Sequence, residues 1–302
     1  MIDQESLEEI ARETICWPTN QKWESTDKKN RFVACFGAPS DVVADIWNRI
    51  EPMLEDDDAH PKHLLWAFVF LKVYSTEEIH CSIVGWPSTR TFRKWSWYFV
   101  EKIADLKDDV IRLENRFADG PIPNPNLIIR NCYLTVDCTD CPVFEPLPFH
   151  PEMYSHKFNG PGIKYEVAIC IRTGHIVWIN GPFAASTSDP TIFENGLSNE
   201  LEENEVVEAD GVYRGPDKAM LPQQGIDSAE RKQKSVARGR HEVVNGRLKQ
   251  FNVLTTHFRH MKPNRNAMFE RHGFCFTAIA VITRLKFEHG GQTFDVAYDV
   301  TY

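Results

Sequence analysis

The 302-residue sequence lacks any apolar run close to the roughly 20 residues that a membrane-spanning helix needs. Its first residues, MIDQESLEEI, lack the basic and then apolar order of a secretory signal peptide. No repeat or low-complexity tract is present, so a repeat architecture is not expected. We therefore expect an intracellular globular protein without a membrane partner.

The sequence also lacks a disulfide rhythm, because its cysteines are scattered, at positions 16, 35, 81, 132, 138, 141, 170 and 275. In a reducing compartment such cysteines are mostly small buried hydrophobic residues. Cys138 and Cys141 have the spacing of a zinc-ligand pair. A zinc site would need two further ligands, and only His150 and His156 lie nearby, at poor spacing. We therefore favour two thiols on a strand over a zinc site.

An excess of positive charge is absent as well. The net charge of −9 argues against a protein that coats nucleic acid indiscriminately. Its distribution is uneven: residues 194–228 carry nine acids and two bases, whereas residues 229–271 carry eleven Lys or Arg and three acids. A local basic segment suits a partner whose phosphates approach one face of the protein. A solvated helix surface explains the same pattern equally well.

Composition divides the chain into four predicted parts. Residues 1–59 are acidic and are expected to form a loosely attached arm with one helix near residues 40–53. Residues 60–117 are expected to form a helical domain. The segment ADGPIPNPN, rich in proline and asparagine, predicts a linker at 118–128. Residues 129–302 then form a domain that begins with strands.

The helical domain has the pattern of a helix-turn-helix. Residues 61–107 predict three helices, with Ser75 and Glu78 as a capping box for the second and Ser88 as the cap of the third. A short helix, a glycine-containing turn and a longer helix form this motif. Four side chains in the first turn of the third helix would meet a DNA major groove: Thr89, Arg90, Arg93 and Lys94. Plain helix packing remains the alternative.

The second half of the chain predicts a mixed α/β fold. Strands are expected at 133–144, 163–172, 174–183 and 204–213, and helices at 188–201, 240–254 and 272–290. Short links between the first three strands indicate an antiparallel meander. Three strands, a helix, a strand and a helix is the element order of the ribonuclease H-like fold, a five-stranded mixed sheet flanked by helices. We expect this fold, preceded by the all-α helix-turn-helix domain.

Three carboxylates stand out in this layout. Asp137 lies within a strand that should be buried, Asp210 ends the fourth predicted strand, and Glu242 opens a predicted helix. In the ribonuclease H-like fold these three positions converge. Three carboxylates at one spot repel one another unless a cation is present, and hard divalent cations prefer oxygen ligands. Glu208 is a rival ligand, and Asp189 either caps its helix or joins the site.

Each acid also has a simpler explanation. A pairing with Arg130 would account for Asp137, and a turn cap would account for Asp210. Glu242 would be favoured at a helix N-terminus by the helix macrodipole. These alternatives stay open at the level of the sequence.

Five blocks in order resemble the catalytic domain of PIF/Harbinger-type DDE transposases: TVDCTDCPVF, YSHKFNGPGIKYEVAI, FAASTSDPTIF, EADGVYRG and RHEVVNGRLKQF. The resemblance covers roughly residues 130–290, and the helices of 61–107 are similar to the helix-turn-helix that precedes this domain in the family. It implies that Asp137, Asp210 and Glu242 bind two Mg²⁺ or Mn²⁺ ions. The chain departs from the family at Asp140, where a histidine commonly follows Asp-x-Thr.

The resemblance implies a metal-dependent DNA nuclease and strand transferase that cleaves phosphodiesters by a two-metal mechanism. The implied partners are double-stranded DNA, a Myb-like DNA-binding protein and further copies of the chain, in the nucleus with the cytoplasm as a shared location. Contacts to the DNA backbone are expected from His156, Lys157, Arg238 and Lys249. The alternative is a catalytically inactive, transposase-derived DNA-binding protein, and a third hypothesis is a hydrolase of the same fold acting on RNA.

Overall fold

The computed structural model describes residues 1–16, 25–117, 131–148, 150–221, 228–260 and 264–291. The chain divides into two compact units. Unit 1 contains residues 1–110, 248–256 and 274–291, and unit 2 contains residues 111–247 and 257–273 among those described. Within the described ranges no helix combines the length and the apolar character needed to cross a membrane.

Unit 1 is helical throughout its described residues. It contains α1 (Gln4–Thr14), α2 (Ser25–Phe36), α3 (Ser40–Ile50), η1 (Glu51–Met53), α4 (Pro61–Val73), α5 (Glu77–Ile83), α6 (Thr89–Asp105), α7 (Lys107–Val110), η5 (Asn252–Leu254) and the second half of α11 (Arg265–Glu288). Helix α4 is the centre, buried continuously from His63 to Leu71. A helix that is apolar on all sides is stable only when other helices surround it.

Residues 1–59 contribute three helices to unit 1 where the sequence predicted an arm with one. The reason is an apolar stripe that the acidic composition obscures: Leu7 and Ala11 are fully buried. A buried hydrogen bond of 2.6 Å from Ser40 Oγ to Glu8 Oε1 joins α3 to α1. The division into units thus differs from the predicted boundary at residue 59.

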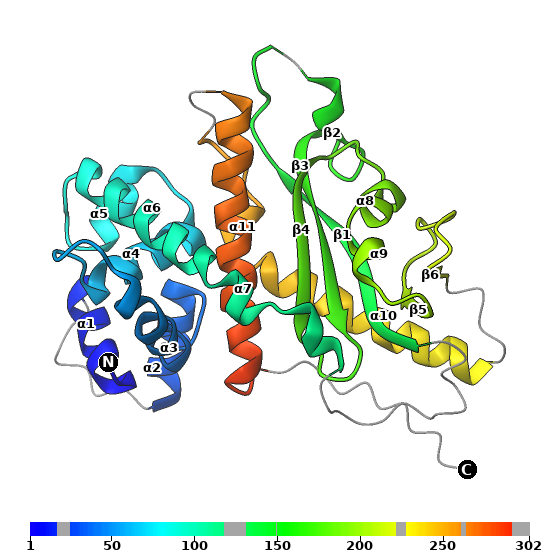
Figure 1. Cartoon of the computed structure of the whole chain (residues 1–302). Helices are drawn as coiled ribbons and strands as arrows, with labels where there is room; N and C mark the ends of the chain where they lie inside the picture. Colours follow the sequence, from blue (N-terminus) through cyan, green and yellow to red (C-terminus); the bar gives the residue numbers. More distant parts are fainter. Residues whose placement is uncertain (17–24, 118–130, 149, 222–227, 261–263, 292–302) are drawn as a thin grey trace. The chain divides into compact units, whose positions relative to one another are not determined.

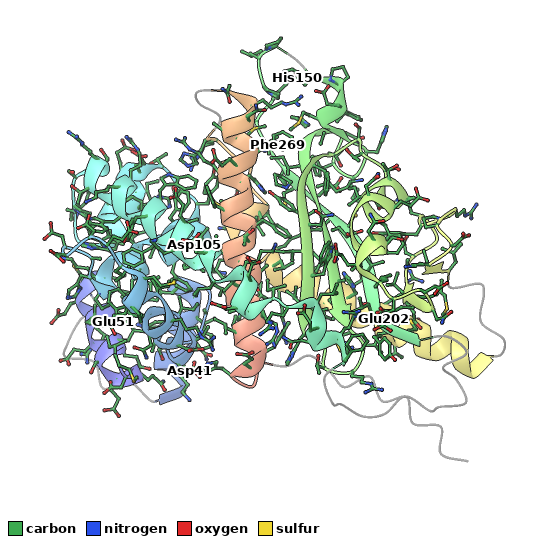
Figure 2. The ribbon with its side chains drawn as sticks, in the orientation of Figure 1. Asp41, Glu51, Asp105, His150, Glu202 and Phe269 are labelled. Carbon is green, nitrogen blue, oxygen red and sulfur yellow. The ribbon has the colours of Figure 1, made fainter. Side chains whose placement is uncertain are left out.

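The acids of this segment make ion pairs at the surface of unit 1. The N-terminal amine lies 2.6 Å from Glu51 Oε2, and His289 Nδ1 lies 3.2 Å from Asp41 Oδ2; both acids are labelled in Figure 2. Exposed pairs of this kind contribute little to stability. The segment is therefore held mainly by its apolar side chains.

Helices α5 and α6 and the turn between them form as predicted, with one difference at a cap. The side chain that caps α5 is Thr76, which accepts a hydrogen bond from the Ile79 amide, and not Ser75. Ser88 caps α6 and accepts from the Thr91 amide at 3.1 Å. The assignment of these helices to a DNA-binding helix-turn-helix stays a prediction.

Unit 2 is a mixed α/β unit, which confirms the predicted class. Its sheet has six strands where five were predicted: β1 (Asn131–Pro142), β2 (Tyr154–Ser155), β3 (Gly160–Cys170), β4 (Ile176–Ala184), β5 (Glu205–Glu208) and β6 (Ala219–Met220). The order is β2-β3-β1-β5-β6, and β4 pairs with β3. Pairs β1–β3 and β3–β4 are antiparallel, whereas β1–β5 and β5–β6 are parallel. The additional strands β2 and β6 have two residues each, too few for an alternating pattern in the sequence.

One face of the sheet is covered by α8 (Asp189–Asn195) and α9 (Leu197–Glu200). Leu134 and Val136 of β1 share a buried cluster with Ile192 and Phe193 of α8. Side chains alternate along a strand, so Thr135 and Asp137 project to the opposite face. The 3-10 turns η2 (Leu113–Phe117) and η3 (Pro151–Met153) complete the unit together with the first part of α11.

The opposite face is covered by α10 (Ser228–Leu248). Its buried side chains recur at helical spacing, at Ala237, Arg240, His241, Val244, Asn245 and Leu248. Thr135 Oγ1 lies 2.9 Å from His241 Nδ1, and Asn245 Nδ2 donates to Asp137 Oδ2 at 3.2 Å. Four helical residues rise about 6 Å and two strand residues about 6.8 Å, so α10 runs alongside β1 in the same direction (Figure 1).

Candidate active site

Asp137 lies in the interior of β1 and is partly buried against α10. One carboxylate oxygen accepts the Cys138 backbone N–H at 2.8 Å, and the other accepts from Asn245 at 3.2 Å. Burial raises the pKa of Asp137 to about 7. The charge of Lys157 lowers this pKa, whereas the charges of Asp210 and Glu242 raise it. The pKa of Asp137 is therefore set by burial together with the charges of Lys157, Asp210 and Glu242.

Asp210 lies two residues beyond the end of β5 and is half-buried. Its Oδ1 accepts the backbone N–H of Val212 at 2.8 Å, so it does form the turn that the sequence left open as an alternative. A carboxylate that caps a turn keeps its second oxygen for another partner. Its charge also acts on Asp137, so the turn and the site role are compatible.

Glu208, the rival ligand, is buried on β5 directly opposite Thr135 of β1. Strand alternation places Asp210 on the same side as Glu208. The pair Thr135–Glu208 lies one side-chain position along β1 from Asp137 on the α10 face. Glu208 is thus beside the candidate site, deeper in the sheet than Asp210.

Glu242 lies in the second half of α10 and is exposed. The sequence predicted that it opens a helix at residue 240, but α10 begins at Ser228 because buried Ala237 and Arg240 extend the packed face. The helix-macrodipole explanation of Glu242 is therefore wrong, since that effect is confined to the first turn. The Arg130 explanation of Asp137 lies outside the described residues.

The three acids offer carboxylate oxygens, the ligand type that hard divalent cations prefer. The charges of Asp210 and Glu242 raise the pKa of Asp137, as expected for carboxylates that share one neighbourhood. Across the described ranges, no three His, Cys, Asp or Glu side chains lie close enough together to hold a metal ion. The type and charge of the three side chains suit a hard cation, but their positions in the structure lie farther apart than those of metal ligands.

Lys157 is a cation whose charge acts on Asp137. Its Nζ donates to the Cys138 carbonyl at 3.0 Å and lies 3.7 Å from Asp140 Oδ1. Partial burial acts to lower the pKa of Lys157, but the carboxylates of Asp140, Asp137 and Asp189 act in the other direction and the pKa is raised. The ammonium thus offsets part of the acidic charge.

Asp140, the position that departs from the family pattern, is buried and accepts a hydrogen bond from the Ser155 hydroxyl of β2. Together with Lys157 this forms a local charge pair that is independent of α10. Cys138 and Cys141 are three residues apart on β1, so their sulfur atoms project to opposite faces of the sheet. Cys138 Sγ accepts from the Tyr213 hydroxyl at 3.3 Å.

Asp189 has a cationic partner of its own. Ser188 caps α8, and Asp189 forms a buried ion pair with Lys164 of β3, whose Nζ lies 2.7 Å from Asp189 Oδ1. Near this pair, Glu166 is fully buried and accepts from Trp178 Nε1 at 3.0 Å. These groups belong to the α8 face of the sheet.

The four predicted groove residues differ in their contacts at the start of α6. Arg93 pairs bidentately with Glu77 of α5, and Lys94 Nζ lies 2.8 Å from Asp56 Oδ2. Thr89 is half-buried and Arg90 is exposed. Two of the four polar side chains therefore have acidic partners within unit 1.

The remaining predicted backbone contacts lie near different elements. Arg238 is half-buried on α10, one turn before Glu242. Lys249 lies in the turn that follows the end of α10 at Leu248. His156 is exposed and its ring packs edge-on against Tyr154.

The sequence analysis missed Asn245 and the Thr135–His241 contact, although both hold α10 against the strand that carries Asp137. The available signal was spacing: Asn245 follows Glu242 by three residues and shares its side of a helix. A single asparagine has no periodic pattern of its own, so this signal is weak.

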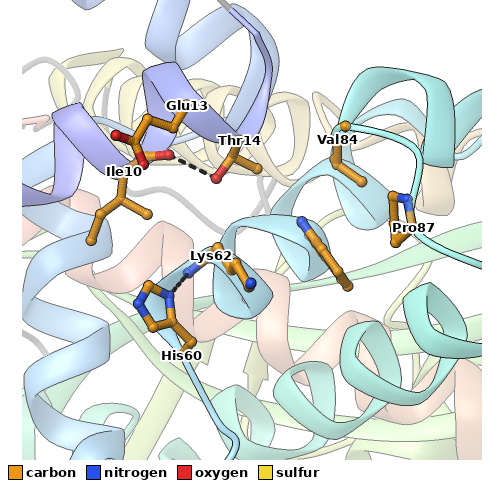
Figure 3. A pocket seen from close by; sticks show the side chains of 9 residues that line it. Ile10, Glu13, Thr14, His60, Lys62, Val84 and Pro87 are labelled. Carbon is orange, nitrogen blue, oxygen red and sulfur yellow. Dashed lines mark hydrogen bonds between the residues drawn. The ribbon is translucent and has the colours of Figure 1, made fainter.

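Unit 1 contains a pocket of about 370 Å³ between α1, α4 and the α5–α6 turn, shown in Figure 3. Glu13, His60, Lys62 and Trp66 are among the residues that line it. None of the three acids of the candidate site is a lining residue. The pocket is therefore separate from the candidate site formed by Asp137, Asp210 and Glu242.

The central strand of the mixed sheet thus carries a partly buried acid on which the charges of two further acids act. Residues 136–284 match the family model described as DDE superfamily endonuclease. The match contains Asp137, Asp210 and Glu242, and it supports a DDE transposase-like family and a nuclease-type enzyme in general. Such a family acts on DNA and generally uses divalent metal ions. Comparisons with curated proteins and with solved structures found no match.

Proposed function

We propose that this protein is a divalent-metal-dependent DNA endonuclease and strand transferase of the DDE type. One observation carries the proposal: the buried carboxyl of Asp137 has its pKa raised to about 7, in part by the charges of Asp210 and Glu242. The acids come from three separate elements of unit 2. A buried carboxyl whose pKa is perturbed by burial and by neighbouring charges favours a functional site over a structural one.

In the proposed mechanism the carboxylates of Asp137, Asp210 and Glu242 would hold the Mg²⁺ or Mn²⁺ ions. When bound, the ions polarise the phosphodiester and stabilise the leaving oxygen. Asp137 is kept in place by the Cys138 amide. Lys157 would then exchange its contacts with the acids for a phosphate oxygen of the substrate.

The finer assignment is to the PIF/Harbinger group with a ribonuclease H-like fold. The strand order supports it, since β4, β3 and β1 form an antiparallel meander and β5 and β6 extend β1 in parallel. On this proposal the catalytic domain spans residues 129–302 and is preceded by the helix-turn-helix.

The proposed partners are double-stranded DNA, a Myb-like DNA-binding protein and further copies of the chain, within the nucleus. The exposed Arg90 at the start of α6 and the half-buried Arg238 of α10 support DNA contact. The net charge of −9 favours a need for a second DNA-binding protein.

The test is cleavage of DNA in Mg²⁺ or Mn²⁺ by the full chain. Asp137→Asn, Asp210→Asn and Glu242→Gln are each expected to lower the cleavage rate at least about 100-fold, because each removes a charge that the ions require. Lys157→Gln is expected to lower it less. Glu203→Gln, an exposed acid before β5, is the matched control and should retain full activity.

Equal cleavage by wild type and Asp137→Asn would contradict the proposal. DNA binding without cleavage in every protein would favour the alternative, a catalytically inactive DNA-binding protein. Faster cleavage of a matched RNA substrate would favour the RNA hydrolase.

A further inference from the structure

Asn245 connects the helix that carries Glu242 to the strand that carries Asp137. It lies three residues after Glu242 in α10, and its side chain is more than nine-tenths buried. Its Nδ2 donates to Asp137 Oδ2 at 3.2 Å. The other Asp137 oxygen accepts the Cys138 amide of the same strand, so Asn245 is the donor that α10 contributes.

The orientation of the Asn245 amide follows from its partner. In the structure the amide nitrogen faces Asp137, as it must whenever that carboxyl is ionised and can only accept hydrogen bonds. The amide oxygen, Oδ1, is then turned elsewhere. It is inaccessible to solvent and has no hydrogen-bond partner among the residues that the structure describes. A buried acceptor without a donor calls for an explanation at this position.

We propose that Asn245 is a member of the candidate cation site, where its Oδ1 serves as a neutral oxygen ligand and its Nδ2 positions Asp137. This inference rests on the proposed function, because it assumes that the acids bind a divalent cation. Hard cations accept amide oxygens as ligands. A neutral ligand adds an oxygen without adding a fourth repelling charge beside Asp137, Asp210 and Glu242.

The experiment is a titration of the full chain with Mn²⁺ by calorimetry, without DNA, together with thermal unfolding of the metal-free proteins. Asn245→Ala removes both the oxygen and the donor and is expected to weaken Mn²⁺ binding about 10- to 100-fold. Asn245→Asp keeps an oxygen and adds charge. It is expected to bind Mn²⁺ at least as tightly as wild type, although the metal-free protein should melt at a lower temperature.

Thr135→Val is the matched control. It removes the other side-chain hydrogen bond between β1 and α10, from Thr135 Oγ1 to His241 Nδ1, and leaves the contact with Asp137 intact. It is expected to lower the melting temperature while the Mn²⁺ dissociation constant stays within about twofold of wild type. A purely structural role of Asn245 would give the same result as this control.

The outcomes separate the inference from the proposed function. Mn²⁺ binding by wild type but not by Asp137→Asn, with unchanged affinity in Asn245→Ala, would overturn the role of Asn245 and leave the function standing. Asn245→Asp binding as weakly as Asn245→Ala would overturn the ligand role too. Absence of binding to wild type at millimolar Mn²⁺, or equal binding to Asp137→Asn, would overturn both.

Discussion

The surroundings of Asp137 disfavour its charged form and so raise its pKa, and the causes can be identified. Burial has the largest effect, and Asp210 and Glu242 add to it. Lys157 acts in the opposite direction but is half-exposed, so water screens it. A buried aspartate with a purely structural role would be expected to form a lasting ion pair with a buried cation. The opposing effects on the pKa of Asp137 instead suit a carboxyl that exchanges one cationic partner for another.

Glu166 is a second carboxyl whose charged form is disfavoured, and it lies on the opposite face of the sheet from Asp137, as the register partner of Cys138. It is fully buried on the α8 face, and burial raises its pKa to about 7. Hydrogen bonds from Trp178 and Asn180 act to lower this pKa, and the charge of Asp189 acts to raise it. The protonated form is therefore the one that the fold favours.

Glu166→Gln is expected to remove a pH dependence of stability. Because the folded pKa of about 7 exceeds the ordinary 4.5, the contribution of Glu166 is fully present below pH 4.5 and is lost as the pH rises through 7. The loss amounts to something on the order of 3 kcal/mol. Urea unfolding of both proteins at pH 4.5 and pH 8 measures it. The difference in unfolding free energy should shift in favour of Glu166→Gln at pH 8, and a constant difference would contradict this explanation.

At the scale of elements, one buried ion pair joins η2 to β5. Arg116 Nε and Nη2 donate to the two oxygens of Glu205 at 2.8 and 3.1 Å, and Glu205 is fully buried. Removing one partner of such a pair leaves an uncompensated charge inside the protein. β5 leads directly to Asp210, so this pair also supports the candidate site.

Arg116→Met is expected to lower the unfolding free energy by about 3–5 kcal/mol, because Glu205 loses its partner. The double variant Arg116→Met/Glu205→Leu should recover most of this loss. Arg112→Met is the control. Arg112 lies four residues before Arg116 and forms an exposed ion pair with Glu114, so its loss should change stability little. Chemical denaturation measures all three. A double variant as unstable as the single one would show that the charge is not the cause.

The elements that the sequence predicted well are those with a strong pattern of their own. β1, β3 and β4 have β-branched and aromatic residues between clear turns, and α6 has a regular apolar stripe and a Ser88 cap. A basic helix was predicted before residue 240 and a second helix from there, but the two are one helix, α10, because packing of Ala237 and Arg240 outweighs the glycine at 239. The two-residue strands have no pattern to detect.

The candidate site shows the same limit. Asp137 could be predicted because a carboxylate in the middle of an apolar strand is costly to bury and so calls for a functional reason. Glu242 was predicted from the order of the elements and from the family resemblance, although its predicted position at the start of a helix was wrong. Asn245 and Lys157 acquire their contacts only in three dimensions, from α10 and from the loop after β2. Such contacts across the sheet have no spacing signal.

At the scale of the whole molecule, unit 1 is not continuous in sequence. Residues 248–256 and 274–291 complete it, and they supply buried side chains such as Phe251, Ile282 and Leu285. Lys72 Nζ donates to the Gln250 carbonyl at 2.8 Å, and Lys286 Nζ donates to the Gly37 carbonyl at 3.1 Å. The chain therefore passes between the two units several times, whereas two domains joined by one linker would be crossed only once.

A chain that ends at residue 117 is accordingly expected not to fold as a stable unit. Each fully buried apolar side chain contributes about 1.5–3 kcal/mol, and losing several exceeds the roughly 5–15 kcal/mol by which a protein is stable. Circular dichroism should show helix without a cooperative thermal transition. Joining residues 1–117 to 248–291 through a flexible linker restores the missing residues and should restore the transition. Cooperative unfolding of the 1–117 fragment at the temperature of the full chain would instead mean that residues 248–256 and 274–291 add little to unit 1, and that the helical domain predicted from the sequence folds independently.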